Sequence, residues 1–522
     1  MTKALDLCDI QGNVVRAYGR FGFPVARYLL LNISEGVGGR SWLAETLPDI
    51  TNSATWSDDP GGFARPKTTL NIAINHAGLV AFELPVESLN SFSTEFAMGM
   101  KMRKDITGDI DLSSPEHWDP VWRSDDASKA VHVLLTINAS TREELETQYE
   151  KVCKQIAKSL GTVTLLDGHR GQNGCLLPYQ EAHIIFENGK PTSKEHFKYT
   201  DGIGDPYFEG IQDPPSRVNG RGKQMADGTW KPLATGEFLH GHLDEAREYP
   251  PAAAPILLSR NGTYMVYRKL HQNVASFDAL LEREGATYPG GAELMAAKFV
   301  GRWRKTGAPL VNAPDKTSHD QWKKDFDNAS KEQQDAMLSN FTYDDDMSGA
   351  RCPISSHIRR LNPRASLELK AGKAPGEFVR NTGSIAKLNA FNTPGALANR
   401  RRVLRRGLPY GDSTDRTNDN GDHGVIMMML NADIGRQFEF VQQQWVNYGN
   451  DFREANDKDV ILGNRSDDIP SSVIHPADPE GDAPPRFVNN IPRLVETRGG
   501  DYFFVPSLTA LRLIARGLID PT

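Results

Sequence analysis

Apolar runs alternate with segments of helical periodicity in the first part of the chain. Three runs predict buried strands, at residues 27–33, 70–75 and 131–137. The segment 141–160 predicts a helix, because Leu145, Val152 and Ile156 recur at helical spacing. Two shorter runs close the set, at 161–167 and 183–190, the second with an Asn-Gly turn.

A second set of the same kind begins near residue 263. Strands are predicted at 263–270, 425–430 and 501–506, and each is followed by a helical segment. Strands interleaved with helices on a mostly antiparallel sheet predict an α+β fold. Two such sets suggest an old duplication without a direct repeat, and we divide the chain into an N-terminal half, 1–220, and a C-terminal half, 221–522.

Long stretches without periodicity separate these elements. Residues 200–260 are rich in Gly, Pro and Asp, and residues 450–498 form a long loop with many Asp, Pro and Asn, whereas residues 283–350 are expected to mix short helices with polar loops. Irregular stretches of this length inside a compact protein are usually functional or cover a ligand.

Composition narrows the classes of protein. The 522 residues carry a formal net charge of -7, so the protein has no overall positive charge that would attract nucleic acid. Four cysteines without a CxxC pair argue against a zinc site or a disulfide framework and indicate a reduced compartment. No apolar run is long enough to span a bilayer, and the first residues lack a signal-peptide core. We therefore expect a cytoplasmic protein without membrane or nucleic-acid partners.

The segment CPISSHIRRLNPR, residues 352–364, combines His357 with Arg359, Arg360 and Arg364. Haem iron takes an imidazole ligand, and its two propionates pair with guanidinium groups. A solvated basic turn explains the same spacing equally well, so the segment alone leaves both interpretations open.

Two further segments offer a carboxylate and a cation. In HFKYTDGIGDP, residues 196–206, Asp201 either belongs to an ordinary turn or is held on a tight loop facing a pocket. In RRVLRRGLPYG, residues 401–411, the arginines either form a solvated face or place one guanidinium where it stabilises developing negative charge.

Taken together, the three segments resemble the dye-decolourising peroxidases, specifically the longer-chain bacterial and fungal branch. The segment 352–364 is similar to that family's proximal-histidine motif. The residues TDG at 200–202 match the end of its G-x-x-D-G signature, and the segment 401–411 is similar to the one that carries its distal arginine. The resemblance continues in matching order through segments 9–15, 263–270, 293–304, 431–445 and 499–512.

The resemblance implies a pair of ferredoxin-like halves with antiparallel sheets, with haem b in the C-terminal half. It assigns His357 as the axial iron ligand and Asp201 and Arg405 as the distal pair that cleaves peroxide. Asp433 is assigned as the carboxylate that accepts the other N–H of the ligand, and Arg364 as a propionate partner. The implied reaction reduces hydrogen peroxide through a ferryl porphyrin radical and oxidises dyes or phenolics.

Two positions depart from the family pattern. Lys198 replaces the first Gly of G-x-x-D-G, which puts the geometry of the Asp201 loop in question. Met427 stands where the family usually has a Phe overlooking the haem, and a thioether is softer and oxidisable.

The alternative is a haem-binding or haem-trafficking protein without significant turnover, which would not need both Asp201 and Arg405. A chlorite-converting relative of similar fold is disfavoured by the same pair. The sequence leaves the physiological donor open, and also whether the protein is a monomer or a homodimer.

Overall fold

The computed structural model describes residues 4–57, 64–211, 217–225, 227–367, 395–466, 473–475 and 484–520. It confirms the first set of predicted elements, except that the run 183–190 forms mainly a short hairpin of β8 (Phe186–Glu187) and β9 (Lys190–Pro191) outside the main sheet. The strands are β1 (Val25–Ile33), β2 (Thr68–Ile74), β3 (Val133–Ala139), β4 (Val163–Leu165) and β7 (Gln180–His183), and the helices include α2 (Gly36–Thr46), α3 (His76–Ala81) and α8 (Arg142–Lys158).

The second set is also confirmed. Its strands are β12 (Thr263–Gln272), β14 (Gly424–Asn431) and β17 (Val495–Val505). Strand β12 is followed by the helix α10 (Val274–Gly285), and β14 by two π-helical segments, η10 (Ile434–Glu439) and η11 (Val441–Val446). Strand β17 is followed by the helix α17 (Leu508–Arg516).

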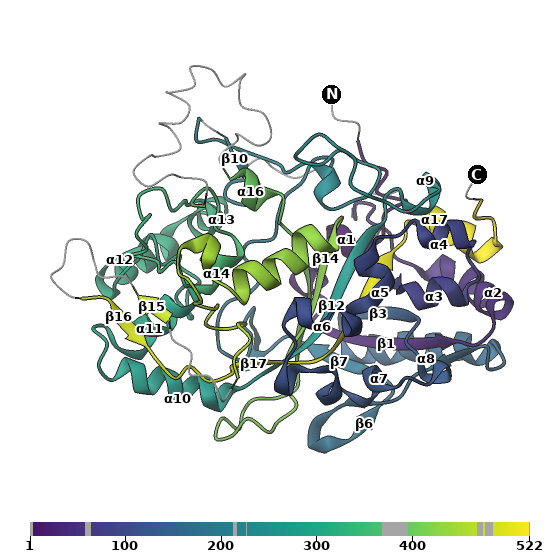
Figure 1. Cartoon of the computed structure of the whole chain (residues 1–522), viewed down its shortest axis with the longest axis horizontal. Helices are drawn as coiled ribbons and strands as arrows, with labels where there is room; N and C mark the ends of the chain where they lie inside the picture. The colour runs from purple at the N-terminus through teal and green to yellow at the C-terminus, as the bar shows by residue number, and fades with distance from the viewer. Residues whose placement is uncertain are drawn as a thin grey trace.

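The two sets share one antiparallel sheet with a further strand, β13 (Leu404–Tyr410), at its edge; the strand order is β13-β14-β12-β17-β2-β3-β1-β4, with β7 paired to β1. The two sets join where Phe504 of β17 pairs with Ile74 of β2. Strands β13 and β7 also contact each other, so the sheet curls until its outer strands meet. Figure 1 shows the sheet passing through the middle of the molecule. Its strands β1 and β3 lie toward one end together with α8, and its strand β14 lies toward the other end together with α14 (His357–Leu361).

Strand β13 (Leu404–Tyr410) was not predicted as a strand. Its sequence LRRGLPY carries two adjacent arginines and a proline, which hide the period of two. In the structure the positions alternate between buried and less buried, and Arg405 and Arg406 point to opposite faces. This alternation decides which arginine reaches the cavity described below.

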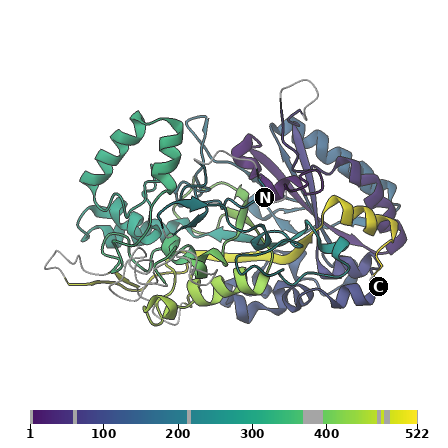
Figure 2. The same ribbon diagram turned by 90° about the horizontal axis from the view of Figure 1, so that it is seen from above.

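Helices cover the sheet on the N-terminal side and form a separate lobe at the other end (Figure 2). That lobe contains α10, α11 (Gly291–Val300), α12 (Lys316–Asn328) and α13 (Lys331–Ser339), with its own buried apolar clusters. The short helices predicted among the polar loops of 283–350 are therefore confirmed. Part of the predicted stretch 450–498 lies outside the described residues. The boundary near residue 220 stays a prediction.

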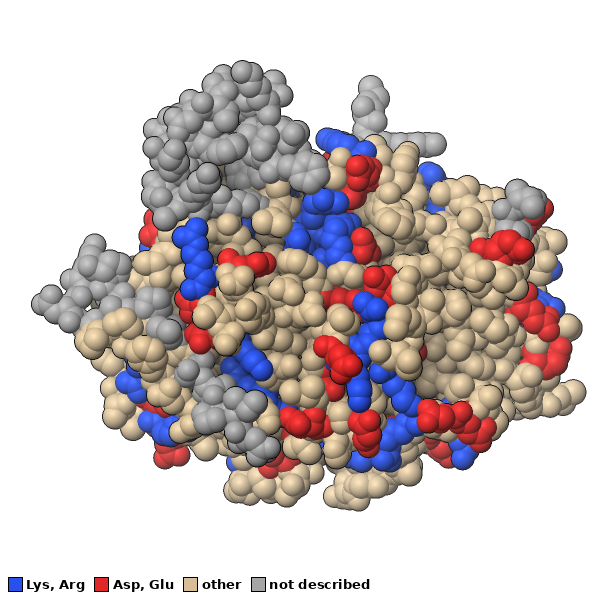
Figure 3. Space-filling model, in the orientation of Figure 1, with Lys and Arg blue, Asp and Glu red and all other residues tan. Residues whose placement is uncertain are grey.

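The surface fits the modest net charge. Acidic and basic side chains are interspersed over the face shown in Figure 3. Among the described residues, no helix combines the length and the apolar character needed to cross a bilayer.

Candidate active site

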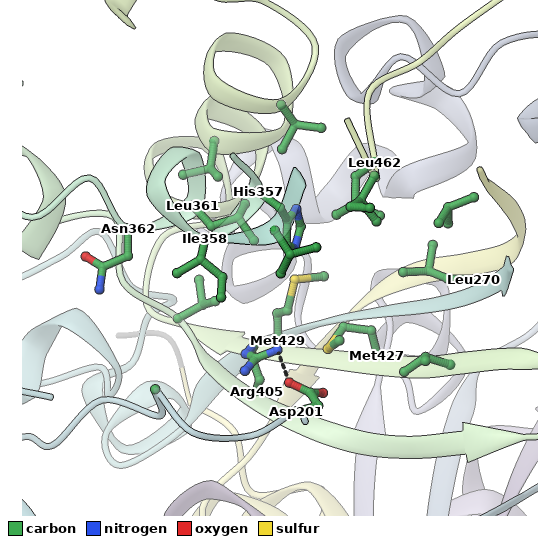
Figure 4. A pocket seen from close by; sticks show the side chains of 18 of the residues that line it. Asp201, Leu270, His357, Ile358, Leu361, Asn362, Arg405, Met427, Met429 and Leu462 are labelled. Carbon is green, nitrogen blue, oxygen red and sulfur yellow. Dashed lines mark hydrogen bonds and ion pairs between the residues drawn. The ribbon is translucent and has the colours of Figure 1, made fainter. Parts of the chain in front are cut away.

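His357 is the first residue of α14, directly after its N-cap Ser356. Its ring Nδ1 lies 3.1 and 3.0 Å from the two carboxylate oxygens of Asp459. The Asp459 carboxylate also accepts bonds from the N–H groups of Ile461 and Leu462. A ring held through Nδ1 presents Nε2 in a fixed direction, and His357 lines the large cavity (Figure 4).

Asp459 is fully buried. Burial by itself would raise its carboxyl pKa, but the facing His357 ring and the backbone N–H of Leu462 outweigh burial and lower the pKa of Asp459. The carboxylate therefore stays ionised beside the imidazole, which makes that ring a stronger electron donor toward a metal.

The assignment of Asp433 as the partner of His357 is wrong. Asp433 caps η10, where its carboxylate accepts bonds from the backbone N–H of Arg436 at 2.9 Å and from that residue's Nε at 3.3 Å. It does not line the cavity. Asp459 was missed because it lies in an aperiodic loop, and its only local signal is a carboxylate just before the apolar run Val460–Leu462.

Asp201 and Arg405 meet as predicted. The Arg405 Nη1 donates to Asp201 Oδ1 at 2.8 Å (Figure 4). Arg405 is positioned by β13, and its backbone N–H donates to Asp205 at 3.1 Å. The charge of Asp201 raises the pKa of Arg405 and outweighs the opposite effect of burial, so the guanidinium is permanently cationic.

One cavity of about 340 Å³ joins these residues. His357 lies on one wall, and Asp201 with Arg405 on another (Figure 4). Met427 and Met429 of β14 also line it, so the prediction that Met427 faces the pocket is supported by its position. Most of the remaining wall is apolar, including Val300, Ile358, Leu361, Phe438, Val441 and Leu462.

Arg364 lines the same cavity, is largely buried, and forms no ion pair with a carboxylate in the described part of the chain. Its Nη2 donates to the carbonyl of Ser339 at 3.0 Å, while its Nε and Nη1 have no hydrogen-bond partner in the described part of the chain. Burial lowers its pKa to about 10. Arg402 nearby has a pKa of about 9, again lowered by burial. The unsatisfied nitrogens of Arg364, with the second cation of Arg402 beside them, fit an anionic ligand such as a propionate.

Lys198 occupies a left-handed conformation, with φ of 73°. This is the conformation that glycine adopts most freely, so the loop before Asp201 keeps the shape typical of a glycine there. Lys198 is exposed and does not line the cavity. The substitution therefore does not distort the meeting of Asp201 with Arg405.

Comparisons with known proteins agree with this geometry. The family model "DyP dimeric alpha+beta barrel domain" matches residues 9–170. Peroxidase 2 of Mycetinis scorodonius is 26% identical over 97% of this chain and 87% of its own length, and the dye-decolorizing peroxidase of Mycena epipterygia is 25% identical over 99% and 88%. The chain belongs to the DyP-type peroxidase family.

Solved DyP-type structures show the same fold. The fungal DyP-type peroxidase from Auricularia auricula-judae superposes with a TM-score of 0.70 at 20% identity, over 98% of this chain and 100% of that one. A dye-decolorizing peroxidase solved in complex with 2,6-dimethoxyphenol gives a TM-score of 0.70 at 21% identity over the same shares. Membership of the DyP-type family implies a haem cofactor.

Proposed function

We propose that this protein is a peroxidase that holds haem b through His357, reduces hydrogen peroxide and oxidises organic donors such as dyes and phenolics. One observation carries the proposal: a single cavity presents an oriented imidazole on one wall and a carboxylate–guanidinium pair on another. Phenolic donors are included because a related dye-decolorizing peroxidase was solved in complex with 2,6-dimethoxyphenol.

The residues present fit haem b. His357 supplies the axial nitrogen, and the Asp459 carboxylate keeps that ring in one orientation. Arg364 and Arg402 supply cations for the propionates, and the apolar wall suits the macrocycle. When bound, haem b supplies the electrons that break the O–O bond and stores the oxidising power that the organic donor later removes.

The distal residues move the proton and stabilise the charge. Asp201 accepts a proton from one peroxide oxygen and returns it to the other, which then leaves as water. Arg405 stabilises the negative charge that develops on the leaving oxygen. Its ion pair with Asp201 holds both groups close enough to act on the same bound peroxide.

A haem carrier without turnover is the alternative. Such a protein would need His357 and the cations of Arg364 and Arg402. The Asp201–Arg405 pair would then face the cavity with nothing to act upon, and it is this pair that favours the peroxidase.

Two variants test the proposal. His357→Ala should lose haem, because the bond from the protein to iron is removed; pyridine-haemochrome titration of the purified protein measures this. His242→Ala is the matched control, since His242 bonds Asn261 and does not line the cavity. Full haem content in His357→Ala, with an unchanged Soret band, would contradict the assignment.

Arg405→Leu and Asp201→Ala should keep haem but react more slowly with peroxide. Fixed charges and general bases each contribute about 10²–10⁴-fold. We expect Arg405→Leu to lose at least as much as Asp201→Ala, because water partly replaces a base but not a cation. Stopped-flow absorbance at several peroxide concentrations gives the bimolecular rates. Wild-type rates in both variants, or an inert spectrum in the parent protein, would favour the carrier.

A further inference from the structure

Three consecutive methionines of β14 face alternately in and out of the cavity. Met427 and Met429 line it, whereas Met428 is 4% exposed and packs in the main apolar core. The alternation follows from the strand period of two. The chain thus presents the same side chain in two environments at neighbouring positions.

The neighbouring strand β13 explains why the two cavity thioethers lie beside the distal pair. Met429 pairs with Arg405 across the strands, and cross-strand partners lie on the same face of a sheet. Met427 pairs with Gly407, which has no side chain to cover it. Figure 4 shows both methionines among the side chains of His357, Asp201 and Arg405.

Met428 has the opposite surroundings. Its cross-strand partner is Arg406, which is buried and donates to the carbonyls of Asn13 and Val14 on the other face of the sheet. Peroxide bound beside Arg405 therefore meets two thioethers directly and is separated from the third by the sheet.

We propose that Met427 and Met429 are sites of self-oxidation, at which peroxide in the cavity converts the protein's own thioethers to sulfoxides when no organic donor is present. The inference rests on the proposed function, because that function brings peroxide to Asp201 and Arg405. A sulfur lone pair forms the new S–O bond and the O–O bond breaks. The transferred oxygen loses its proton, and the departing hydroxide takes up a proton to become water. Sulfur is oxidised by two electrons, and one peroxide is reduced by two.

Two physical consequences follow for the cavity. A sulfoxide is polar, so its formation makes an apolar part of the cavity wall polar. A dedicated reductase is needed to reduce it back to the thioether. An organic donor consumes the same oxidising equivalents, so it protects both methionines. Excess peroxide without a donor should therefore make the cavity wall polar at two known positions, Met427 and Met429.

Peptide mass spectrometry of the haem-loaded protein tests the proposal. Peroxide is added with and without 2,6-dimethoxyphenol, and trypsin then releases residues 417–436 with all three methionines in one peptide. Each sulfoxide adds about 16 Da, and fragmentation assigns it to a residue. Met98 and Met102, which are 43% and 70% exposed, report oxidation by peroxide in bulk solution.

We expect sulfoxide at Met427 and Met429 to form ahead of that at Met98 and Met102, to be absent at Met428, and to decrease when the donor is present. Oxidation that follows solvent exposure, with Met98 and Met102 ahead, would overturn the proposal. So would equal oxidation of Met428, or a yield that the donor does not change.

Variants and a parallel assay complete the test. The double variant Met427→Leu/Met429→Leu should leave the peptide unmodified, whereas Met428→Leu, the matched control, should still gain two oxygens. Oxidation of 2,6-dimethoxyphenol is measured on the same preparation. A preparation that oxidises the phenol without forming sulfoxide refutes the self-oxidation but leaves the peroxidase standing. A preparation that does neither refutes both.

Discussion

At the scale of single residues, His357 could be predicted from the sequence, whereas its hydrogen-bond partner Asp459 could not. The resemblance carried by three segments together, and not the motif around His357 alone, predicted that this histidine faces the same pocket as Asp201 and Arg405, and the structure brings all three to one cavity. Asp459 was not found, because a carboxylate 102 positions away in an aperiodic loop has no periodic relation to the histidine. Only the path of the chain brings them together.

The Asp459–His357 contact predicts an electrochemical change. Asp459→Asn keeps an oxygen that can accept the Nδ1–H bond but removes the negative charge. The imidazole becomes a weaker donor, so the ferric state is less stabilised and the Fe(III)/Fe(II) midpoint potential should rise. Spectroelectrochemical titration of the haem-loaded variant measures the shift.

Asp433→Asn is the control for that measurement. Asp433 pairs with Arg436 at the start of η10 and does not touch His357. Its replacement should leave the potential near that of the parent protein. Equal shifts in the two variants would indicate a general charge effect rather than a specific contact.

At the scale of elements, three buried histidines pack together where β12 ends and β14 begins. The ring of His423 lies with its centroid 5.1 Å from that of His271 and 5.4 Å from that of His196. All three are buried. Charged groups around them include Asp419, Asp422, Arg416, Glu496 and Arg498.

This histidine cluster predicts acid sensitivity of the fold. Burial, with His271 close by, lowers the pKa of His423 to about 4, and burial with His423 lowers that of His196 to about 4. An unfolded histidine titrates near pH 6.5, so folding favours the neutral ring. The stabilisation is complete above about pH 6.5 and is lost as pH falls toward 4, by up to roughly 3 kcal/mol for each ring.

Thermal unfolding from pH 7 to pH 4 measures this loss. His423→Phe should flatten the profile, because neither ring nitrogen of His423 has a hydrogen-bond partner among the described residues and a phenyl ring loses nothing there. His117→Phe, at an exposed position, is the control. If His423→Phe loses stability with acid as steeply as the control, the cluster is not the cause.

At the scale of the whole molecule, the sequence predicted two sets of strands and helices but not how they join. Period-two patterns identify strands because burial is local to each strand. The pairing of β17 with β2 depends on segments about 430 positions apart, and β13 was obscured by its charges. The shared sheet could therefore be seen only in the folded chain.

Gln11 reinforces this junction. It is fully buried, and its amide NH₂ donates to the carbonyls of Ile72 in β2 and Pro506 just after β17. Its carbonyl accepts the N–H of Ile72. The side chain thus takes the place of a neighbouring strand at β2.

Gln11→Leu should destabilise the protein. The variant leaves three buried backbone groups without these partners, at about 1–3 kcal/mol for each group that water cannot reach. Denaturant unfolding followed by tryptophan fluorescence measures the loss. Gln321→Leu on the exposed face of α12 should change little. A change in Gln11→Leu no larger than this control would show that the junction does not depend on Gln11.

The position of β17 between β12 and β2 also has a consequence for biosynthesis. Ile74 leaves the ribosome long before Phe504, and at about 5–20 residues per second the interval is tens of seconds. Throughout that interval the partial sheet of β1, β2 and β3 has no β17 beside it. The cavity, whose wall includes Val495 and Thr497 of β17, is completed only afterwards. We therefore expect haem to be captured only after β17 has been translated.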